Sequence, residues 1–381
     1  MIKSILGSLA LVWALIATAI PIILANYNPL YAMAIAYCPI IILCGTKLFS
    51  DKLFLSALVL TILSYLFSFD GKLGTIIPLI LMPSVFVFFT NNSDGFNWNY
   101  RLLAYLVFLT NCGIVIYEYT NHINLLSFDL SVESRFRATG LWMHPLMNAI
   151  LHTVCVFFVL VSNANKYVKI FTILIGVYVI FMFDARLATV TLFLGITYIA
   201  YLFGFFSSKR VLYLVMVSIA ASYFIDYLDS SDLGGKLFDS KKNTLADPST
   251  VARFKAFQIF WDAGSDVWLF GADKTKFLFK YSCVEIENAL FEFIFLSGSI
   301  IVIPFLYIYI KGIFNMMKDI DIIFKVLILG SFLLMCMFCS SFSKSFMWMA
   351  FIFFYKGFGP YEQIPNKEYK MFIPKWLSRY A

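Results

Sequence analysis

Long apolar runs broken by short polar segments are the dominant pattern of this chain. A helix needs about 20 apolar residues to cross a hydrocarbon core, and by that measure the pattern predicts about twelve spans. Because backbone groups in lipid must be hydrogen-bonded within the protein, we expect these runs to be helices, some of them short or interrupted by proline. Their approximate limits are 4–25, 30–46, 53–69, 73–90, 101–119, 146–162, 167–183, 187–206, 209–226, 288–310, 322–342 and 345–358.

Composition narrows the class to integral membrane proteins. Of the 381 residues, 61% are hydrophobic and only 13% are charged, so a water-soluble globule would expose mostly apolar surface. The mean hydropathy is +0.84. We therefore predict an all-α polytopic fold in which residues 1–381 form a single membrane domain. Ala17-Thr18-Ala19 is similar to a signal-peptide cleavage site, but the apolar run continues beyond it, so we expect an uncleaved first helix.

The net charge of +7 arises from lysines and arginines that lie in short clusters between the apolar runs. Because these clusters form no continuous basic face, the charge indicates membrane topology and predicts no nucleic-acid partner. With the N-terminus inside, the short cytoplasmic segments hold most of the cations, and both long loops, 120–145 and 227–287, face outward. Cys283 lies in the second loop, whereas the other cysteines lie in or beside apolar runs. We expect no structural disulfide.

The large outer loop, 227–287, has internal order. Asp247 and Pro248 are typical of an N-cap and a first helical position, and they predict a helix through Trp261. At helical spacing an apolar stripe runs along one side, although Ile259 and Phe260 fall outside it. We interpret the segment as a helix that lies along the outer membrane surface. The stripe consists of Val251, Phe254, Phe257 and Trp261.

Charged residues from three separate loops fall on the outer side of this topology. They can converge on one pocket, but polar residues also occur in loops simply because loops are solvated. Asp184-Ala-Arg186 is the strongest signal, because it interrupts two apolar runs and charges in a membrane usually face protein or a wet cavity. The alternative is a simple interfacial ion pair. The set comprises Arg135, Arg137, His144, Asp184, Arg186, Arg253, Glu285 and Glu287.

Three outward arginines on different loops indicate a polyanionic ligand. The guanidinium group suits a diphosphate, because its forked donors bind two oxygens at once and it stays charged at any relevant pH. When a sugar is transferred from a lipid diphosphate, the leaving group gains charge. Donors already in place would stabilise that charge. The arginines are Arg137, Arg186 and Arg253.

Such a transfer also needs a general base to take the proton of the acceptor hydroxyl. Glu287, Glu285 and His144 are the candidates, and His144, which precedes a proline, is alternatively a helix cap. Glu292 lies inside a predicted span, where an ionisable residue either serves function or pairs with a neighbouring helix. The histidines lack ligand-like spacing with acids, so we predict no metal site, with a divalent ion at Glu285-Ile-Glu287 as the less favoured alternative.

Several of these segments resemble the O-antigen polymerase and ligase superfamily, over residues 133–305. Arg137-Ala-Thr-Gly140-Leu-Trp-Met-His-Pro145 resembles the family's Arg-x-x-Gly segment before a helix start that contains proline. Asp184-Ala-Arg186-Leu-Ala resembles its Ser-Arg segment. Arg253, followed by Leu269-Phe-Gly271, resembles its large-loop arginine and the Leu-x-Gly turn after it.

A fourth segment separates polymerases from ligases. Ligases carry a His-Asn type pair, nine residues and then glycine, and here Glu287-Asn288 is followed by nine residues and Gly298. Because Glu287 stands in place of the histidine, the resemblance favours a polymerase. It implies a GT-C-like membrane glycosyltransferase that joins undecaprenyl-diphosphate-linked repeat units at the periplasmic face of the bacterial inner membrane.

The resemblance also implies roles for individual residues. Arg137, Arg186 and Arg253 would hold the diphosphate, and Glu287 or His144 would act as base. The supporting residues would be Arg135, Asp184, Glu285 and Asn288. No cofactor or metal would be needed, and the expected partners are the lipid-linked glycan, membrane lipid and a regulator of chain length. The alternatives are an O-antigen ligase acting on lipid A core and a flippase for lipid-linked oligosaccharides.

Overall fold

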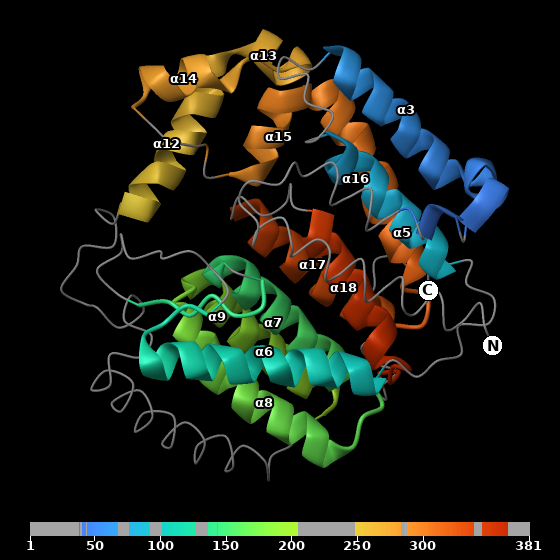
Figure 1. Cartoon of the computed structure of the whole chain (residues 1–381), viewed down its shortest axis with the longest axis vertical. Coiled ribbons are helices and arrows are strands. Elements are labelled where there is room, and N and C mark those ends of the chain that lie inside the picture. The colour runs from blue at the N-terminus through green and yellow to red at the C-terminus, as the bar shows by residue number, and fades with distance from the viewer. Residues whose placement is uncertain are drawn as a thin grey trace. The chain divides into compact units, whose positions relative to one another are not determined.

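Helices make up most of the computed structural model of the chain (Figure 1). Within the described ranges there is no β-strand, only an isolated bridge between Ser162 and Tyr361. The predicted all-helical class is therefore confirmed, whereas the predicted helices 4–25 and 209–226 lie outside the described residues. The structure describes residues 38, 40–42, 44–67, 76–91, 101–125, 136–142, 144–204, 248–282, 286, 288–338 and 345–364.

Packing divides the chain into two units, which we call the first and the second unit. The first consists of 1–98, 241–317 and 333–353, and the second of 99–240, 318–332 and 354–381. Two helices, α17 (Ile322–Phe338) and α18 (Ser345–Phe358), contribute residues to both. The single membrane domain expected for 1–381 stays a prediction.

The second unit is built around α7. Its chain order is α6 (Arg101–Asn121), α7 (Pro145–Val161), α8 (Lys166–Ile180), the short 3-10 helix η3 (Phe181–Phe183) and α9 (Arg186–Leu202). Helix α7 is buried at nearly every position, and α8 and α9 both pack against it. Because α8 runs back between them in sequence, α7 and α9 begin at the same end of this unit (Figure 1).

Two glycines let α8 and α9 approach α7 closely. A β-carbon added to Gly176 would lie 2.8 Å from Cγ2 of Val156, and one added to Gly195 would collide with the ring of Phe157. Small residues at helix contacts are typical of membrane bundles, where close backbone approach replaces the hydrophobic effect as a source of packing energy. The side of α8 away from α7 is apolar and exposed, as expected for a helix that faces lipid. Its exposed residues are Tyr167, Ile170, Phe171, Leu174 and Tyr178.

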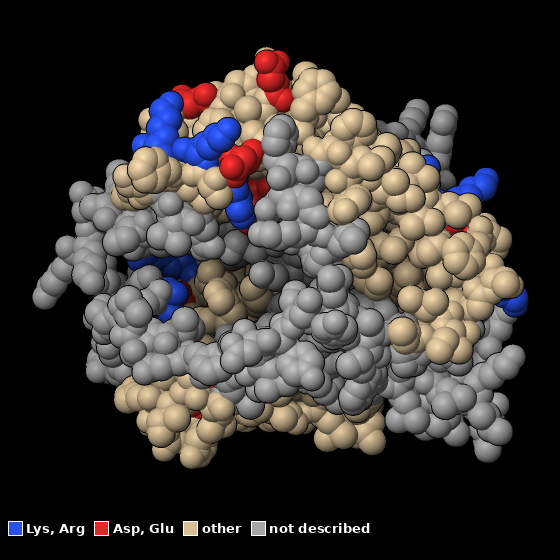
Figure 2. All heavy atoms as spheres, turned by 45° about the horizontal axis from the view of Figure 1, so that its top comes forward, with Lys and Arg blue, Asp and Glu red and all other residues tan. Residues whose placement is uncertain are grey.

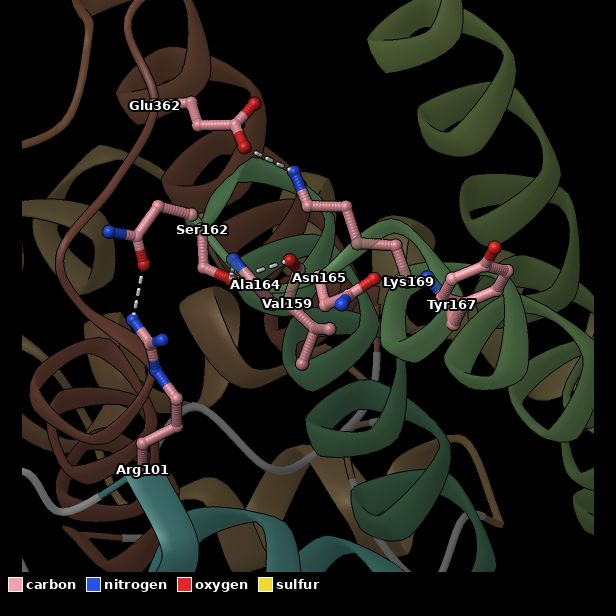
Figure 3. A network of polar contacts seen from close by, with 9 residues as sticks. Arg101, Val159, Ser162, Ala164, Asn165, Tyr167, Lys169 and Glu362 are labelled. Atoms are coloured by element: carbon pink, nitrogen blue, oxygen red, sulfur yellow. Dashed lines mark hydrogen bonds and ion pairs between the residues drawn. The ribbon is translucent and has the colours of Figure 1, made fainter.

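At the other end of the second unit, the segment after α18 closes onto the α7–α8 connection (Figure 3). The Asn163 backbone N–H donates to the carbonyl of Pro360 (3.0 Å), and that of Glu362 donates to Val161 (2.8 Å). Arg101, at the start of α6, donates to the carbonyl of Gly359 (3.0 Å) and to the Asn163 side chain. The start of α6 and the end of α7 therefore lie at one end of this unit.

The first unit places α16 among three other helices. In chain order it has a 3-10 helix η1 (Gly45–Ser50), α3 (Lys52–Phe67), a π-helical turn η2 (Ile77–Leu81), α5 (Met82–Asn91), α15 (Ala289–Ser297) and α16 (Ser299–Met316). Helices α3, α5 and α15 pack on α16. Gly312 of α16 receives the side chain of Leu53, and the buried hydroxyls of Ser64 and Ser297 share a hydrogen bond of 2.7 Å.

Three further helices of the first unit come from the predicted outer loop. They are α12 (Pro248–Ala263), α13 (Ser265–Phe270) and α14 (Lys274–Lys280). The predicted helix through Trp261 is confirmed, and the four residues of its apolar stripe are all exposed. Ile259, which did not fit the stripe, is buried in a core with Ala256 and Phe295. Helix α12 therefore has apolar residues on two sides, one of them buried.

The predicted single span 288–310 is wrong, because the chain breaks at Gly298. This glycine has φ of 74° and ψ of 154°, which ends α15 before α16 begins. Residues with a β-carbon rarely adopt such a conformation. The hydropathy pattern passes smoothly through the break, since both helices are apolar.

Among the described residues, two helices are long and apolar enough to cross a membrane, α6 with 21 residues and α16 with 18. At 1.5 Å per residue they are about 32 and 27 Å long, close to the thickness of a hydrocarbon core. Several other described helices are apolar but have 10–17 residues. The coarse prediction of a helical membrane protein is supported, and the count of about twelve spans stays a prediction.

Candidate functional site

A buried carboxylate organises the segment that contains Arg137. Glu118 lies near the end of α6 and is fully buried. Its Oε2 accepts hydrogen bonds from the backbone N–H groups of Thr139 (2.7 Å) and Gly140 (2.8 Å), and its Oε1 accepts one from Leu125 (2.9 Å). Backbone donors of this kind compensate a carboxylate for the loss of water. Glu118 therefore fixes the backbone directly after Arg137.

Two asparagines complete the support of this segment. Asn111 of α6 accepts a hydrogen bond from the Leu141 backbone N–H (3.0 Å), and Asn148 of α7 donates to the carbonyl of Thr139. Gly140 between them has φ of 58°, and an added β-carbon would lie 2.7 Å from Oδ1 of Asn111. Only glycine satisfies both the backbone conformation and the space at this position.

The structure brings Arg137 and Asp184 together. The Arg137 Nε lies 3.5 Å from Oδ2 of Asp184, and both side chains are largely buried. The backbone N–H of Ala138 also donates to the carbonyl of Met182 (3.1 Å), which ties the two segments together. Asp184 has φ of 49°, so the chain turns sharply between η3 and α9. Asp184 therefore has an ionic partner in Arg137, from another segment of the chain, and the interfacial ion pair considered for Asp184 and Arg186 stays a prediction.

Arg186 is the first residue of α9, and the N-cap before it is Ala185, which makes no side-chain capping bond. His144 holds the N-cap position of α7, and its ring makes no capping bond either. His144 is thus the N-cap residue of α7, as one of the two alternatives predicted, but its side chain does not cap the helix. Helix N-termini carry partial positive charge, so two of them with neighbouring arginines favour an anion.

The remaining predicted site residues belong to the first unit or are not described. Arg253 lies in the first half of α12. Arg135, Glu285 and Glu287 lie outside the described residues. Asn288 caps α15, where its Oδ1 accepts from the backbone N–H groups of Leu290 and Phe291, both at 3.1 Å.

Glu292, considered as either a functional residue or an interhelical partner, has a partner on another helix. Its carboxylate pairs with the Lys274 ammonium of α14 at 2.5 Å. Among the residues that the structure describes, no group of three His, Cys, Asp or Glu side chains is arranged to hold a metal ion.

Two glycines from separate predicted motifs meet in the first unit. An added β-carbon on Gly271 would lie 2.7 Å from the carbonyl oxygen of Phe295 and 3.1 Å from the nitrogen of Gly298. One on Gly298 would strike the backbone of Leu269 and Phe270. The Ala272 N–H donates to the Phe295 carbonyl at 2.8 Å. The turn after α13 therefore packs backbone against backbone on the α15–α16 break.

Neither family models nor curated proteins match this sequence, and no solved structure matches its fold.

Sequence reasoning missed Glu118 and Asn111. Both lie in the predicted span 101–119, where a carboxylate and an amide among apolar residues are themselves a signal. Their partners in the Arg137 segment, however, are mainly backbone groups 21 to 30 residues further along the chain. Such partners have no side-chain signature in a sequence.

Proposed function

We propose that this chain is a multi-pass glycosyltransferase of the bacterial inner membrane. It polymerises undecaprenyl-diphosphate-linked repeat units at the periplasmic face, with about twelve spans in a GT-C-like arrangement. The lipid diphosphate is the leaving group. The donor therefore needs no nucleotide. The protein has to position the two substrates and stabilise the charge that develops on the diphosphate.

The observation that carries the proposal is the arrangement around Arg137 and Arg186. Two arginines and two helix N-termini without side-chain caps gather at one end of the second unit. The backbone there is held by Glu118, so little reorganisation is needed when charge develops. Fixed donors in a partly buried place stabilise an anion more strongly than mobile donors in water.

Each residue then has a defined task. Arg137 and Arg186 bind the oxygens of the departing diphosphate, and Asp184 orients the Arg137 guanidinium through its contact with Nε. His144, at the N-cap of α7, lies in the same unit and is one choice for the base. The tasks of Arg253 as a further diphosphate ligand and of Glu287 as the other choice for the base rest on the sequence resemblance.

The proposal is tested by complementation of a deletion strain. Arg137→Ala, Arg186→Ala and Arg253→Ala should each abolish the ladder of chain lengths, because losing one such donor costs about 10²–10³ in rate. Arg→Lys at the same positions should restore only part of the ladder, since an ammonium keeps the charge and loses the fork. Lys169→Ala, at the opposite end of the second unit, is the matched control.

An unchanged ladder with Arg186→Ala, at normal protein levels in the membrane, would refute the proposal. Two other outcomes identify the alternatives. A ligase would leave long chains that fail to reach lipid A. A flippase would move labelled lipid-linked oligosaccharide without any new glycosidic bond. Purified protein and a defined lipid-linked repeat unit, examined for dimers, distinguish all three.

A further inference from the structure

Helices α12, α13 and α14 form a platform with a core of its own. Its centre contains Ala256 and Ile259 of α12 with Phe295 of α15. Phe260 stacks on Phe291 at 4.1 Å between ring centroids, and the Trp268 indole donates to the Phe260 carbonyl at 2.6 Å. The platform is therefore fixed to α15 by packing that leaves the opposite side of α12 uncovered.

Large aromatic rings are exposed on all three helices of the platform. Phe279 of α14 is 90% exposed, Trp261 of α12 is 65% exposed, Phe254 is 62% exposed and Phe270 of α13 is 58% exposed. Three separate helices thus expose aromatic side chains that are not buried in the core of the first unit. Soluble proteins rarely expose aromatic residues at this density, and such surfaces mark contacts with a partner or a membrane.

Basic and acidic side chains lie close together near the top of Figure 2. Lys276 and Lys280 are exposed on α14, beside Phe279. Two of the nearby acids have local partners, and a third, Asp266, is exposed in the first turn of α13. A hydrogen bond from the Thr275 hydroxyl, with one from its backbone, lowers the pKa of Asp273, which caps α14. Asp262 accepts a hydrogen bond from the Tyr281 hydroxyl, which raises the pKa of that tyrosine.

The platform is also continuous with a membrane span. Helix α15 ends at Gly298, and α16, which is long and apolar enough to cross a bilayer, begins at the next residue. Gly271 and Gly298 lock the turn after α13 onto this point. The turn after α13 is therefore held at the start of α16, and Phe270 directly precedes that turn.

We infer that the exposed aromatic residues of α12–α14 rest in the headgroup region of a lipid bilayer, with Lys276 and Lys280 against anionic lipid phosphates. Aromatic rings beside lysines are typical of helices that lie in this interface. The inference extends the surface position predicted for α12 to α13 and α14, and it does not depend on the proposed enzymatic activity.

Photo-crosslinking in the full-length protein tests this position. A benzophenone amino acid replaces Phe279, and the protein is reconstituted in nanodiscs of phosphatidylcholine with or without phosphatidylglycerol. We expect a lipid adduct as strong as that from position 174, on the exposed apolar side of α8. Adducts at position 174 without lipid adducts at 279 would overturn the inference, as would adducts at 279 only with protein.

The role of the lysines has a separate readout. Phosphatidylglycerol should raise the lipid adduct at position 279, and Lys276→Gln with Lys280→Gln should reduce that gain by about fivefold per lysine. Lys276→Arg with Lys280→Arg is the matched control and should keep the gain. Equal gains in the Gln and Arg proteins would exclude contact of these lysines with anionic phosphates.

Discussion

At the scale of residues, the second unit depends on polar groups that sit inside an otherwise apolar bundle. Glu118 and Asn111 hold the backbone between Arg137 and α7, and Asn148 holds it from the other side. Buried polar groups of this kind stabilise one arrangement strongly, because any other arrangement leaves donors without acceptors. The arginine segment is consequently preformed.

We predict that Glu118→Ala lowers the free energy of unfolding by about 3 kcal/mol, because it leaves the buried N–H groups of Thr139 and Gly140 without an acceptor. Glu118→Gln should cost about half of that. The measurement is thermal unfolding of detergent-solubilised protein. Glu362→Gln, which is half-exposed, is the control and should change stability little. Equal effects at both glutamates would contradict the role given to Glu118.

A second residue-scale prediction concerns Gly298. Gly264 and Gly298 have similar positive φ values, 84° and 74°, but an added β-carbon meets nothing within 4 Å at Gly264 and backbone atoms at Gly298. Gly264→Ala should therefore cost about 1–3 kcal/mol of strain alone. Gly298→Ala should cost clearly more, measured by the same unfolding assay. If the two variants were equally stable, the close packing of Gly271 on Gly298 would be disproved.

At the scale of elements, the apolar pattern gave most helices of the described chain to within a few residues. Predicted 101–119 corresponds to α6 at Arg101–Asn121, and predicted 146–162 to α7 at Pro145–Val161. The pattern failed at 288–310, because backbone contacts and not side-chain hydropathy end α15. Periodicity also predicted only the exposed apolar side of α12 and missed the buried side that contains Ile259.

An element-scale prediction compares two contacts of the segment after α18, of which the Lys169–Glu362 pair is drawn in Figure 3. Lys169 and Glu362 form a partly exposed pair at 3.0 Å, and Lys169→Ala should cost no more than about 1 kcal/mol. Arg101 donates to the carbonyl of Gly359, and Arg101→Ala should cost about 1.5–3 kcal/mol, since bonds to charged groups are stronger. Thermal unfolding of both variants tests this order. A larger loss for Lys169→Ala would reverse it.

At the scale of the whole molecule, the described helices of the second unit carry charged residues at two opposite ends. Arg137, Asp184 and Arg186 lie at one end of the unit, and Arg101 and Lys169 lie at the other. This separation agrees with the topology that the lysine and arginine distribution predicts. Arg253 belongs to the first unit, so its task stays a prediction from sequence.

The topology itself can be measured in whole cells. We predict that a membrane-impermeant thiol reagent labels a cysteine introduced at Ile123 and fails to label one at Lys166, in a background without the native cysteines. Both positions are exposed, so burial does not explain a difference. Labelling of position 166 alone would invert the orientation, and labelling of both would refute the membrane position of α6 and α7.

The sequence by itself determined the helical class, most helix limits and the group of charged residues between spans. These features follow from the hydropathy and the order of residues within one segment. A helix in lipid must hydrogen-bond its own backbone groups and expose apolar side chains to the lipid. Tertiary structure alone decided that Asp184 pairs with Arg137, that Glu118 holds the segment after Arg137, and that Gly271 packs on Gly298. Those contacts join residues far apart in the chain, and the contacts of Glu118 and Gly298 are made to backbone groups, which are the same in every residue type.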